Sequence, residues 1–387
     1  MKKKIAILGS TGSIGKTLLD IIRKDRKNFE IVLLTADVNY KLLLKQAKEF
    51  KVKNLIIANK KIVKLLKQEE ISQSVNILSN FNNFSKIFKK KIDYTMSSIT
   101  GINGLEPTLN IIKHTKKIVI ANKESIICGW NLINKELKKN KTEFIPVDSE
   151  HFSIWYGIQN IDIVNIEKIF ITASGGPFYS LPLKRFKDIK ISHALKHPNW
   201  KMGKKISVDS ATMINKIYEV IEAKNIFNVN YKQIEILIHP KSYIHAIIKL
   251  NNGLTKIIAH DTTMKVPIFN TLYADMNKKL NSKKIDITTL NNLNFKKINP
   301  KRYPITKLLD ILPIDQSLFE TVIVSANDTL VELFLDNKIK FTDIQKKLFH
   351  IVKKKNFLKY RKIYPRKIED IIELNNYVRL KTIENSI

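Results

Sequence analysis

The run KKISVDSATMINKIYE, from Lys204 to Glu219, holds the densest group of chemically capable side chains in this sequence. Its apolar residues recur at helical spacing, which predicts an amphipathic helix from Ser210 to Phe227. The buried stripe of this helix would consist of Ile214, Ile217 and Ile221. The polar side chains would then share the opposite face.

Three of those polar side chains, Asn215, Lys216 and Glu219, are three or four residues apart and so are neighbours on a helix. With Asp209 or Ser210 as the N-cap, Ser210 would lie at the helix N-terminus, where free N–H groups favour a phosphate. This predicts an anion site beside a carboxylate. A solvated helix face with an ordinary Lys–Glu pair is the alternative interpretation.

Polar clusters follow two predicted strands, at the sheet edge where α/β proteins bind ligands. One is Asn122-Lys123-Glu124-Ser125 and the other is Asp148-Ser149-Glu150-His151. In an extended segment Asp148 and Glu150 would share a face, and Glu219 could supply a third carboxylate. Such a set suits Mg²⁺ or Mn²⁺, although Asp-x-Glu alone also fits ordinary surface acidity.

The N-terminus reads as a strand, a glycine turn and a helix, which is the order that a dinucleotide site needs. A strand over Lys4–Leu8 leads into GSTGSIG at Gly9–Gly15, and a second strand follows at Glu30–Ala36. The glycines allow a tight turn and close approach of the backbone to a pyrophosphate. A purely structural glycine turn is the alternative.

Strands alternate with helical segments through the first part of the chain, which predicts a doubly wound parallel sheet. A second, mixed sheet and a helical C-terminal part should follow. The further strands are expected at Asn54–Ala58, Val75–Leu78, Asp93–Ser97, Lys117–Ala121, Glu143–Val147, Gln233–Ile238 and His245–Leu250, and the C-terminal helices at Ser317–Leu335, Phe341–Val352 and Ile368–Lys381.

Two loops are candidates for ligand contacts. Ile169–Phe178 is a buried strand that enters a serine–glycine turn, whose amides could form an anion nest. Leu195–Gly203 carries Trp200 and Met202 without a helix or strand pattern, which fits a lid. A loop anchored by a buried tryptophan fits equally well.

Composition limits the protein class. The chain has 387 residues, enough for two or three domains, and a net charge of +33. Only seven of its 68 basic residues are arginine, and no nucleic-acid-binding motif accompanies the charge, so specific nucleic-acid binding is not expected. Cys128 is the single cysteine, which excludes an internal disulfide. With no signal-like or membrane-spanning stretch, we expect a cytoplasmic protein.

With these motifs in order, the chain resembles the 1-deoxy-D-xylulose 5-phosphate reductoisomerase family of the non-mevalonate isoprenoid pathway. The resemblance covers nearly all of the chain. It is carried by GSTGSIG, ANKES, PVDSEH, SGGPF, HPNWKMG, KISVDSATMINK with the following Glu219, and the IHP run at Ile238–Pro240.

The resemblance implies an NADPH-dependent oxidoreductase and isomerase that forms a homodimer, uses Mg²⁺ or Mn²⁺ and converts a sugar phosphate to 2-C-methyl-D-erythritol 4-phosphate. It implies catalytic roles for Lys123, Asp148, Glu150, His197 and Glu219, and metal binding by Asp148, Glu150 and Glu219. Substrate would be bound by Lys123, Ser149, Glu150, Ser174, His197, Ser210, Asn215, Lys216 and Glu219. Cofactor would be bound by Gly9, Ser10, Thr11, Gly12, Ser13, Ile14, Asp37, Val38, Asn39, Asn122, Glu124 and Gly203.

Some positions depart from the family pattern. Ile217-Tyr218 replaces Gly-Leu, HDTTM ends at Met264 where Pro-Asp-Met is usual, and SAND stands at Ser325–Asp328. After the second strand, Asp37-Val38-Asn39 replaces a Gly-Lys-Asn run, and an acidic residue there is typical of NAD sites. We therefore expect NADPH with weaker discrimination against NADH.

The predicted fold is α/β, with an N-terminal Rossmann-type doubly wound sheet, a central α+β catalytic domain and a C-terminal helical domain. The corresponding boundaries are 1–148 for the dinucleotide-binding domain, 149–275 for the catalytic domain, 276–299 for a linker and 300–387 for the helical domain. A Rossmann oxidoreductase without rearrangement is the closest rival, and a nucleic-acid-binding protein on the same scaffold is a second. No membrane partner is expected.

Overall fold

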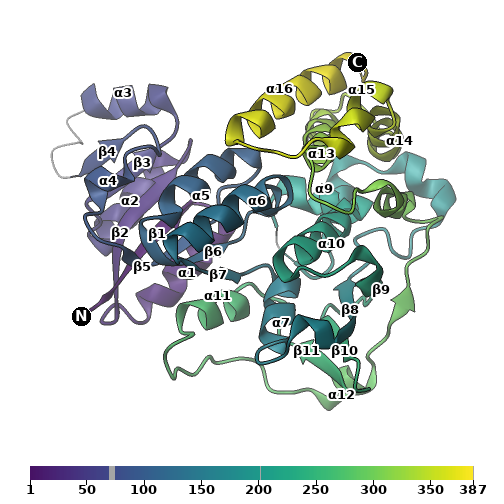
Figure 1. Ribbon diagram of the computed structural model, residues 1–387, viewed down its shortest axis with the longest axis horizontal. Helices are drawn as coiled ribbons and strands as arrows, with labels where there is room; N and C mark the ends of the chain where they lie inside the picture. The colour runs from purple at the N-terminus through teal and green to yellow at the C-terminus, as the bar shows by residue number, and fades with distance from the viewer. Residues whose placement is uncertain (69–74, 201, 387) are drawn as a thin grey trace. The chain divides into compact units, whose positions relative to one another are not determined.

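The computed structural model describes residues 1–68, 75–200 and 202–386, and they form two compact units (Figure 1). The first unit contains Met1–Ser125, Leu132–Asp148 and Met264–Leu280. The second contains Ile126–Asn131, Ser149–Thr263 and Asn281–Ile387. The predicted boundaries at residues 148, 275 and 299 remain a prediction. Within the described ranges, no helix is both long and apolar enough to cross a bilayer.

The first unit is built on a seven-stranded sheet in the order β4-β3-β2-β1-β5-β6-β7. Every pairing is parallel, as expected. The strands are β1 (Lys3–Leu8), β2 (Phe29–Ala36), β3 (Asn54–Ile57), β4 (Asn76–Leu78), β5 (Ile92–Ser97), β6 (Thr115–Ile120) and β7 (Glu143–Pro146). The strand order reverses between β1 and β5, which is the switch point where such sheets bind ligands.

Helices follow these strands and bury their apolar faces against the sheet. They are α1 (Ser13–Arg23), α2 (Tyr40–Phe50), α3 (Lys60–Gln68), α4 (Phe84–Ile87), α5 (Leu105–Ile112) and α6 (Lys123–Asn140). A later helix, α11 (Lys265–Leu272), returns to this unit and packs on α1. Tyr273 just after it contacts the ring of Phe29 with centroids 5.4 Å apart and donates a 2.9 Å hydrogen bond to Asp25.

The second unit contains the predicted mixed sheet, in the order β11-β10-β8-β9-β12. Its strands are β8 (Ile166–Ala173), β9 (Ile234–Ile238), β10 (Ile244–Leu250), β11 (Thr255–Ala259) and β12 (Lys296–Lys297). Among these strands of the described residues, β8 and β9 pair in parallel and the other neighbours pair antiparallel. The sequence pattern did not reveal β11 or β12, because neither has a buried face.

The helices of the second unit include the three predicted near the C-terminus. The α-helices of this unit are α7 (Ser149–Gly157), α8 (Ile191–Ala194), α9 (Lys204–Thr212), α10 (Ile214–Phe227), α12 (Ile287–Asn291), α13 (Phe319–Leu335), α14 (Phe341–Val352), α15 (Lys355–Leu358) and α16 (Ile368–Glu384). The three that were predicted are α13, α14 and α16. In Figure 1 the yellow-green helices α13, α14 and α16 gather at the C-terminal end of the chain, where α13 packs against both others.

The single helix predicted over Ser210–Phe227 is wrong in its first turn. Met213 adopts a left-handed conformation with φ 71°, which separates α9 from α10. Ser210 therefore lies in the last turn of α9 and not at a helix N-terminus. The apolar stripe is confirmed, since Ile214, Ile217 and Ile221 are fully buried.

The prediction that Asp148 to Glu150 forms an extended segment is also wrong. Helix α7 begins at Ser149, so Glu150 lies in a first helical turn and Asp148 directly precedes it. A helical turn after a strand changes the direction of successive side chains. Residues two apart consequently no longer share a face by the alternation rule of strands.

Candidate active site

Three carboxylates gather at the start of α7. Oxygens of Asp148, Glu150 and Glu219 all lie within 4.8 Å of one another, and Glu219 is only 1% exposed. Asp148 closes the first unit but is joined directly to Ser149, so the chain itself holds its carboxylate near α7. Clustered hard oxygen ligands fit Mg²⁺ or Mn²⁺, which supports the predicted metal set.

Lysine side chains neutralise this cluster. The ammonium of Lys216 is 3.1 Å from Glu150 and also pairs with Glu219, while Lys123 pairs with Asp148. Lys216 is only 5% exposed, so the solvated helix face is excluded for this pair. The alternating charges allow these groups to be buried together, because an unpaired buried charge would be far less stable.

Neutral donors complete the environment of the cluster. Asn215 donates a 2.6 Å hydrogen bond to Glu219, and the hydroxyl of Ser149 donates one of 2.6 Å to Glu150. Donors of this kind hold each carboxylate in one orientation, which a metal site requires of its surroundings. Ser149, Glu150, Asn215, Lys216 and Glu219 are therefore found together in the second unit, while Lys123 pairs with Asp148 in the first.

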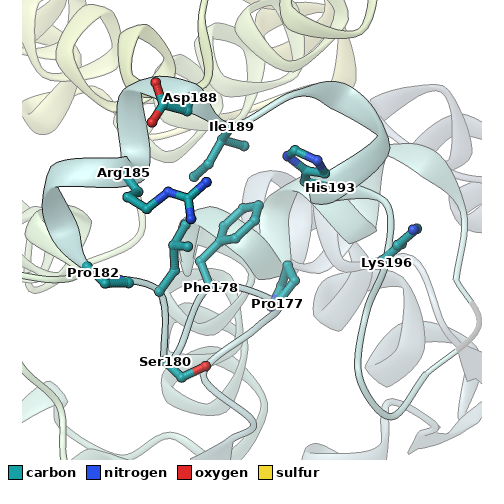
Figure 2. Close-up of a pocket in the computed structure, with 10 residues that line it drawn as sticks. Pro177, Phe178, Ser180, Pro182, Arg185, Asp188, Ile189, His193 and Lys196 are labelled. Atoms are coloured by element: carbon teal, nitrogen blue, oxygen red, sulfur yellow. The ribbon is translucent and has the colours of Figure 1, made fainter.

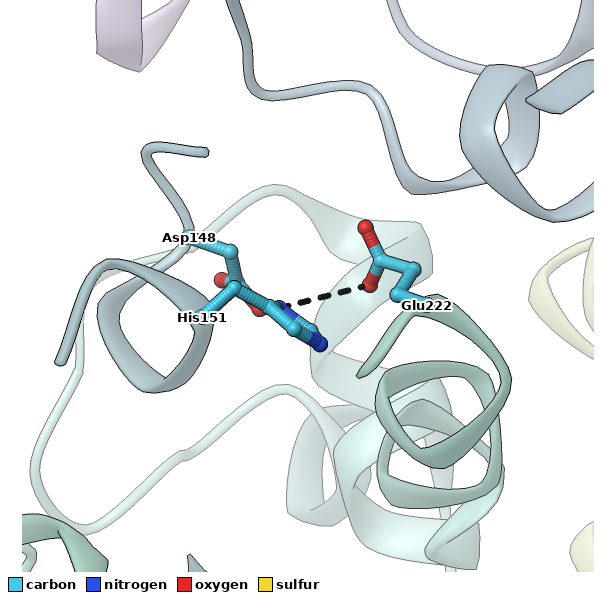
Figure 3. A group of neighbouring side chains, drawn as sticks. All are labelled: Asp148, His151 and Glu222. Carbon is cyan, nitrogen blue, oxygen red and sulfur yellow. Dashed lines mark ion pairs between the residues drawn. The ribbon is translucent and has the colours of Figure 1, made fainter. Parts of the chain in front are cut away.

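Sequence reasoning missed a second group that shares Asp148. It contains His151 and Glu222, and one ligand atom from each of the three residues lies within 4.8 Å of the others (Figure 3). Nε2 of His151 lies 2.9 Å from the backbone carbonyl of Glu219, and Nδ1 is 3.8 Å from Glu222. A signal existed, since His151 follows Asp148 and Glu222 follows Glu219 by the same three residues. His151 thus braces the backbone of a metal candidate.

Of the residues that the family resemblance assigns to the substrate phosphate and adjacent hydroxyls, Asn215 and Lys216 lie in α10, while Ser174 lies in the turn after β8 and Ser210 in α9 beside it. Gly175 and Gly176 have φ values of 87° and 69°, and the amide of Gly176 donates a 3.1 Å hydrogen bond to Ser174 Oγ. A Cβ at Gly176 would come within 2.9 Å of the carbonyl of Ser210, so glycine permits the turn to pack against α9. Ser174 and Ser210 are thereby held near each other without the helix N-terminus that was predicted.

His197 joins this group from the loop that follows α8. Its Nε2 lies 3.2 Å from Ser174 Oγ. Burial, followed by the nearby ammonium of Lys216, lowers the pKa of His197 to about 4. The ring is therefore neutral near pH 7 and can act as a hydrogen-bond donor without adding a charge.

The loop Leu195–Gly203 has neither helix nor strand in its described residues, as predicted; Lys201 lies outside them. Trp200 is half-buried and meets the ring of His245 edge-on, with centroids 6.2 Å apart. Met202 is half-buried as well, and Gly203 is the N-cap of α9. The lid role remains a prediction.

The glycine turn in the first unit has the geometry that the sequence predicts. Gly9 has φ 85°, and a Cβ at Gly15 would come within 2.5 Å of the Cα of Ser10. Gly12 is the N-cap of α1, so the helix N-terminus faces the turn. These features fit the pyrophosphate of a dinucleotide; Thr11 lies in the turn, and Ser13 and Ile14 begin α1.

Other predicted cofactor residues have structural partners. Ser10 is buried and donates a 2.8 Å hydrogen bond to Gln46, and Asn122 caps α6 by accepting one of 2.6 Å from Ser125. Glu124 is buried in the first turn of α6. In contrast, Asp37, Val38 and Asn39 form an exposed segment beyond β2, open to a ligand. Their cofactor roles remain predictions.

The three sequence departures are accommodated by packing. Tyr218 is buried, with the ammonium of Lys205 5.6 Å from its ring centroid. His260 of the HDTTM segment stacks on His245 with ring centroids 3.8 Å apart. Asn327 of the SAND segment donates a 2.8 Å hydrogen bond to Asp209. None of them displaces a residue of the carboxylate cluster.

A pocket of about 450 Å³ lies beside the serine–glycine turn (Figure 2). Its lining includes Phe178, Arg185, Asp188, His193 and Lys196. None of the predicted site residues lines it. The chemistry described above therefore lies elsewhere.

The fold and these residues define a Rossmann-type α/β enzyme whose carboxylate and lysine centre suits a divalent cation and a phosphorylated ligand. A family model described as 1-deoxy-D-xylulose 5-phosphate reductoisomerase matches residues 5–129, and models of the C-terminal domains of that enzyme match 144–227 and 261–381. The chain belongs to the 1-deoxy-D-xylulose 5-phosphate reductoisomerase family, which confirms the resemblance.

Relatives align with most or all of the chain. The reductoisomerase of Pelagibacter ubique is 59% identical over 391 aligned residues, covering 100% of both chains, and that of Wolbachia pipientis wMel is 39% identical over 88% of both. The solved reductoisomerase of Zymomonas mobilis with NADPH is 30% identical, with a TM-score of 0.87 and coverage of 100% and 99%. A reductoisomerase solved with NADPH, fosmidomycin and magnesium has a TM-score of 0.90, 30% identity and coverage of 99% and 98%. The predicted fold class is confirmed.

Proposed function

We propose that this chain converts 1-deoxy-D-xylulose 5-phosphate to 2-C-methyl-D-erythritol 4-phosphate by rearrangement of the carbon skeleton and NADPH-dependent reduction. The observation that carries the proposal is the cluster of Asp148, Glu150 and Glu219 with oxygens within 4.8 Å of one another. A simple dehydrogenase does not need such a cluster. A rearrangement of the carbon skeleton at two oxygen-bearing carbons benefits from one metal cation that orients both of those oxygens.

Each part of the site has a role in this reaction. Asp148, Glu150 and Glu219 would hold Mg²⁺ or Mn²⁺, which supplies Lewis acidity and orientation when bound. Ser174, Ser210, Asn215 and Lys216 would hold the substrate phosphate, so that remote binding energy keeps the reacting carbons in place, and His197 would line the same pocket. Lys123 pairs with Asp148, and its ammonium group would lie near the substrate oxygens. The glycine turn would hold NADPH, which supplies the hydride.

The direct test is an assay of NADPH oxidation with 1-deoxy-D-xylulose 5-phosphate, with and without Mn²⁺ or Mg²⁺. We expect turnover that requires the metal and a product whose carbon NMR spectrum shows a branched skeleton. An unbranched product would support the rival dehydrogenase, and metal-independent turnover would contradict the role of the carboxylates.

A variant sharpens this test. Glu219→Gln keeps the size of the side chain but removes its charge, so Mn²⁺ affinity and turnover should fall together, each by about tenfold or more. Calorimetric titration with Mn²⁺ measures the affinity without turnover. Glu167→Gln is the matched control, because Glu167 pairs with Lys249 on the surface. Full Mn²⁺ affinity in Glu219→Gln would exclude Glu219 as a ligand.

We also infer a homodimer, and β11 supports this inference. β11 is an edge strand of the mixed sheet; Ile257 in β11 is 54% exposed, and Leu254 just before the strand is 63% exposed. An apolar open edge is a ready template for pairing with another chain. Light scattering should give twice the chain mass for the parent protein and a smaller mass for Ile257→Lys. A monomeric parent would contradict the inference.

We infer the cytoplasm as the location, supported by the single buried cysteine, which needs no oxidising compartment. The four-part division at residues 148, 275 and 299 remains our proposal. Limited proteolysis would test it.

A further inference from the structure

Asn199 ties the loop after α8 to another part of the second unit. Its side-chain amide donates hydrogen bonds of 2.7 Å to the carbonyl of Pro240 and 2.9 Å to the hydroxyl of Ser242. Pro240 and Ser242 belong to the turn between β9 and β10, in which Ser242 adopts φ 50°. The side chain of Asn199 therefore acts as a clamp between a loop and a turn that are far apart in sequence.

The same loop determines the protonation pattern of His197. Nδ1 of His197 is the acceptor for the backbone amides of Asn199, at 3.2 Å, and Trp200, at 3.0 Å. Backbone amides only donate, so Nδ1 must carry a lone pair. In a neutral ring the proton then lies on Nε2, which faces Ser174 Oγ at 3.2 Å.

We propose that Asn199 is a positioning residue that, by clamping residues 197–200 to the turn at 240–242, holds His197 as the Nε2–H tautomer directed at the phosphate-binding serine. The proposal deepens the proposed function and rests on it for the identity of the bound phosphate. His197 would donate to a phosphate oxygen from Nε2, and Ser174 would donate beside it. A free loop would let the ring rotate or exchange tautomers, which places a lone pair where a donor is needed.

The geometry excludes a simpler role for Asn199 as a surface residue. Both of its amide hydrogens are used on fixed acceptors, and its backbone amide is used on His197. The position of the His197 ring, its tautomer and the conformation of residues 197–200 therefore all depend on Asn199. The low pKa of His197, which follows mainly from burial, is consistent with a neutral ring in this state.

The test measures the tautomer directly by nitrogen–proton correlation NMR of protein labelled with ¹⁵N-histidine, with His197→Gln used to assign the signal. We expect the parent protein to show the Nε2–H pattern, and Asn199→Ala to show mixed tautomers. Asn199→Asp keeps the size but loses the donors to Pro240, so it should behave like Asn199→Ala. Asn251→Ala is the control, since Asn251 also donates to a backbone carbonyl, that of Val164 at 2.9 Å, outside this loop.

Kinetics give a second measurement. Loss of one well-directed phosphate contact should raise KM for 1-deoxy-D-xylulose 5-phosphate by about tenfold, equivalent to about 1.4 kcal/mol, with a smaller change in kcat. An unchanged tautomer in both Asn199 variants, or an Nδ1–H pattern in the parent protein, would overturn the proposal. A parent without turnover would instead reject the proposed function, and the NMR comparison would still decide the role of Asn199.

Discussion

The ammonium of Lys216 lies between two carboxylates, Glu150 and Glu219, that are also candidate metal ligands. A lysine ammonium and a divalent cation cannot both bind the same carboxylate oxygens closely, because the two positive charges repel each other at short range in a buried site. Metal binding should therefore move the ammonium away from at least one carboxylate. A displaced Lys216 is then available to a substrate phosphate.

Lys216→Met tests this exchange, because methionine keeps much of the length and loses the charge. We expect Mn²⁺ to bind the variant at least as tightly as the parent, while KM for the substrate rises by about tenfold or more. Calorimetry with Mn²⁺ and steady-state kinetics measure the two effects separately. A fall in Mn²⁺ affinity would mean that Lys216 supports the metal site.

Asp37 gives a prediction about the cofactor. It lies exposed beyond β2, where a carboxylate would repel the 2′-phosphate of NADPH. Asp37→Gly should raise the ratio of kcat/KM for NADPH to that for NADH by about fivefold to tenfold, with Asp162→Gly as a control outside this loop. An unchanged ratio would show that Asp37 does not face the ribose.

Residue types and spacing identified Asp148, Glu150 and Glu219 and the lysines as candidate site residues, because charged side chains and short sequence spacings can be read directly from the sequence. His151 and Glu222 were missed. A histidine that bonds to the carbonyl of Glu219, 68 residues away, depends on the packing of α7 against α10. The shared three-residue spacing from Asp148 to His151 and from Glu219 to Glu222 does not by itself show that such a contact forms.

At the scale of elements, the break between α9 and α10 was the main error. The apolar period continues through Met213, and methionine gives no warning of a left-handed conformation, which glycine or asparagine usually signals. Contacts distant in sequence hold the end of α9 instead. Asn327 of α13 donates to Asp209, and Gln345 of α14 donates a 3.1 Å hydrogen bond to the carbonyl of Thr212.

Helix α13 carries a pH-dependent element at its first turn. Glu320 is 1% exposed and accepts hydrogen bonds from the amide and hydroxyl of Ser317, at 3.1 and 2.7 Å. Burial raises the pKa of Glu320 to about 7. Stability from the neutral carboxyl group is fully present below its unfolded pKa and is lost as the pH rises through about 7.

Glu320→Gln should remove this loss. Between about pH 5 and about pH 8, the parent should lose about 2 kcal/mol more unfolding free energy than the variant, since one pKa unit corresponds to about 1.4 kcal/mol. Urea unfolding at both pH values measures the difference, with Glu332→Gln on the exposed part of α13 as the control. Parallel pH profiles would show that Glu320 ionises freely in the folded protein.

At the scale of the whole molecule, the net charge of +33 should act on phosphorylated ligands. A strongly positive protein attracts an anionic substrate from a distance, and salt screens that attraction. Raising NaCl from about 0.05 M to about 0.5 M should increase KM for the sugar phosphate several-fold, with less effect on kcat. A KM independent of salt would show that only contacts inside the site matter.

Most of the fold could be predicted from the sequence. The strands β1 to β7 and the helices α13, α14 and α16 are long, buried or strongly periodic, and their predicted limits lie within three residues of the observed ones. The exposed β11 and the two-residue β12 could not be found, because their pairing and not their composition makes them strands. The return of Met264–Leu280 to the first unit likewise depends on tertiary contacts.

That return has a consequence for synthesis on the ribosome. The first unit needs α11 and Tyr273, whose ring and hydroxyl contact Phe29 and Asp25, yet these residues are made only after Ser149–Thr263 of the second unit. A nascent chain of 148 residues would therefore expose the surface that α11 covers. During translation the first unit therefore cannot complete its fold until most of the second unit has been synthesised. A fragment expressed without Met264–Leu280 should be prone to aggregation.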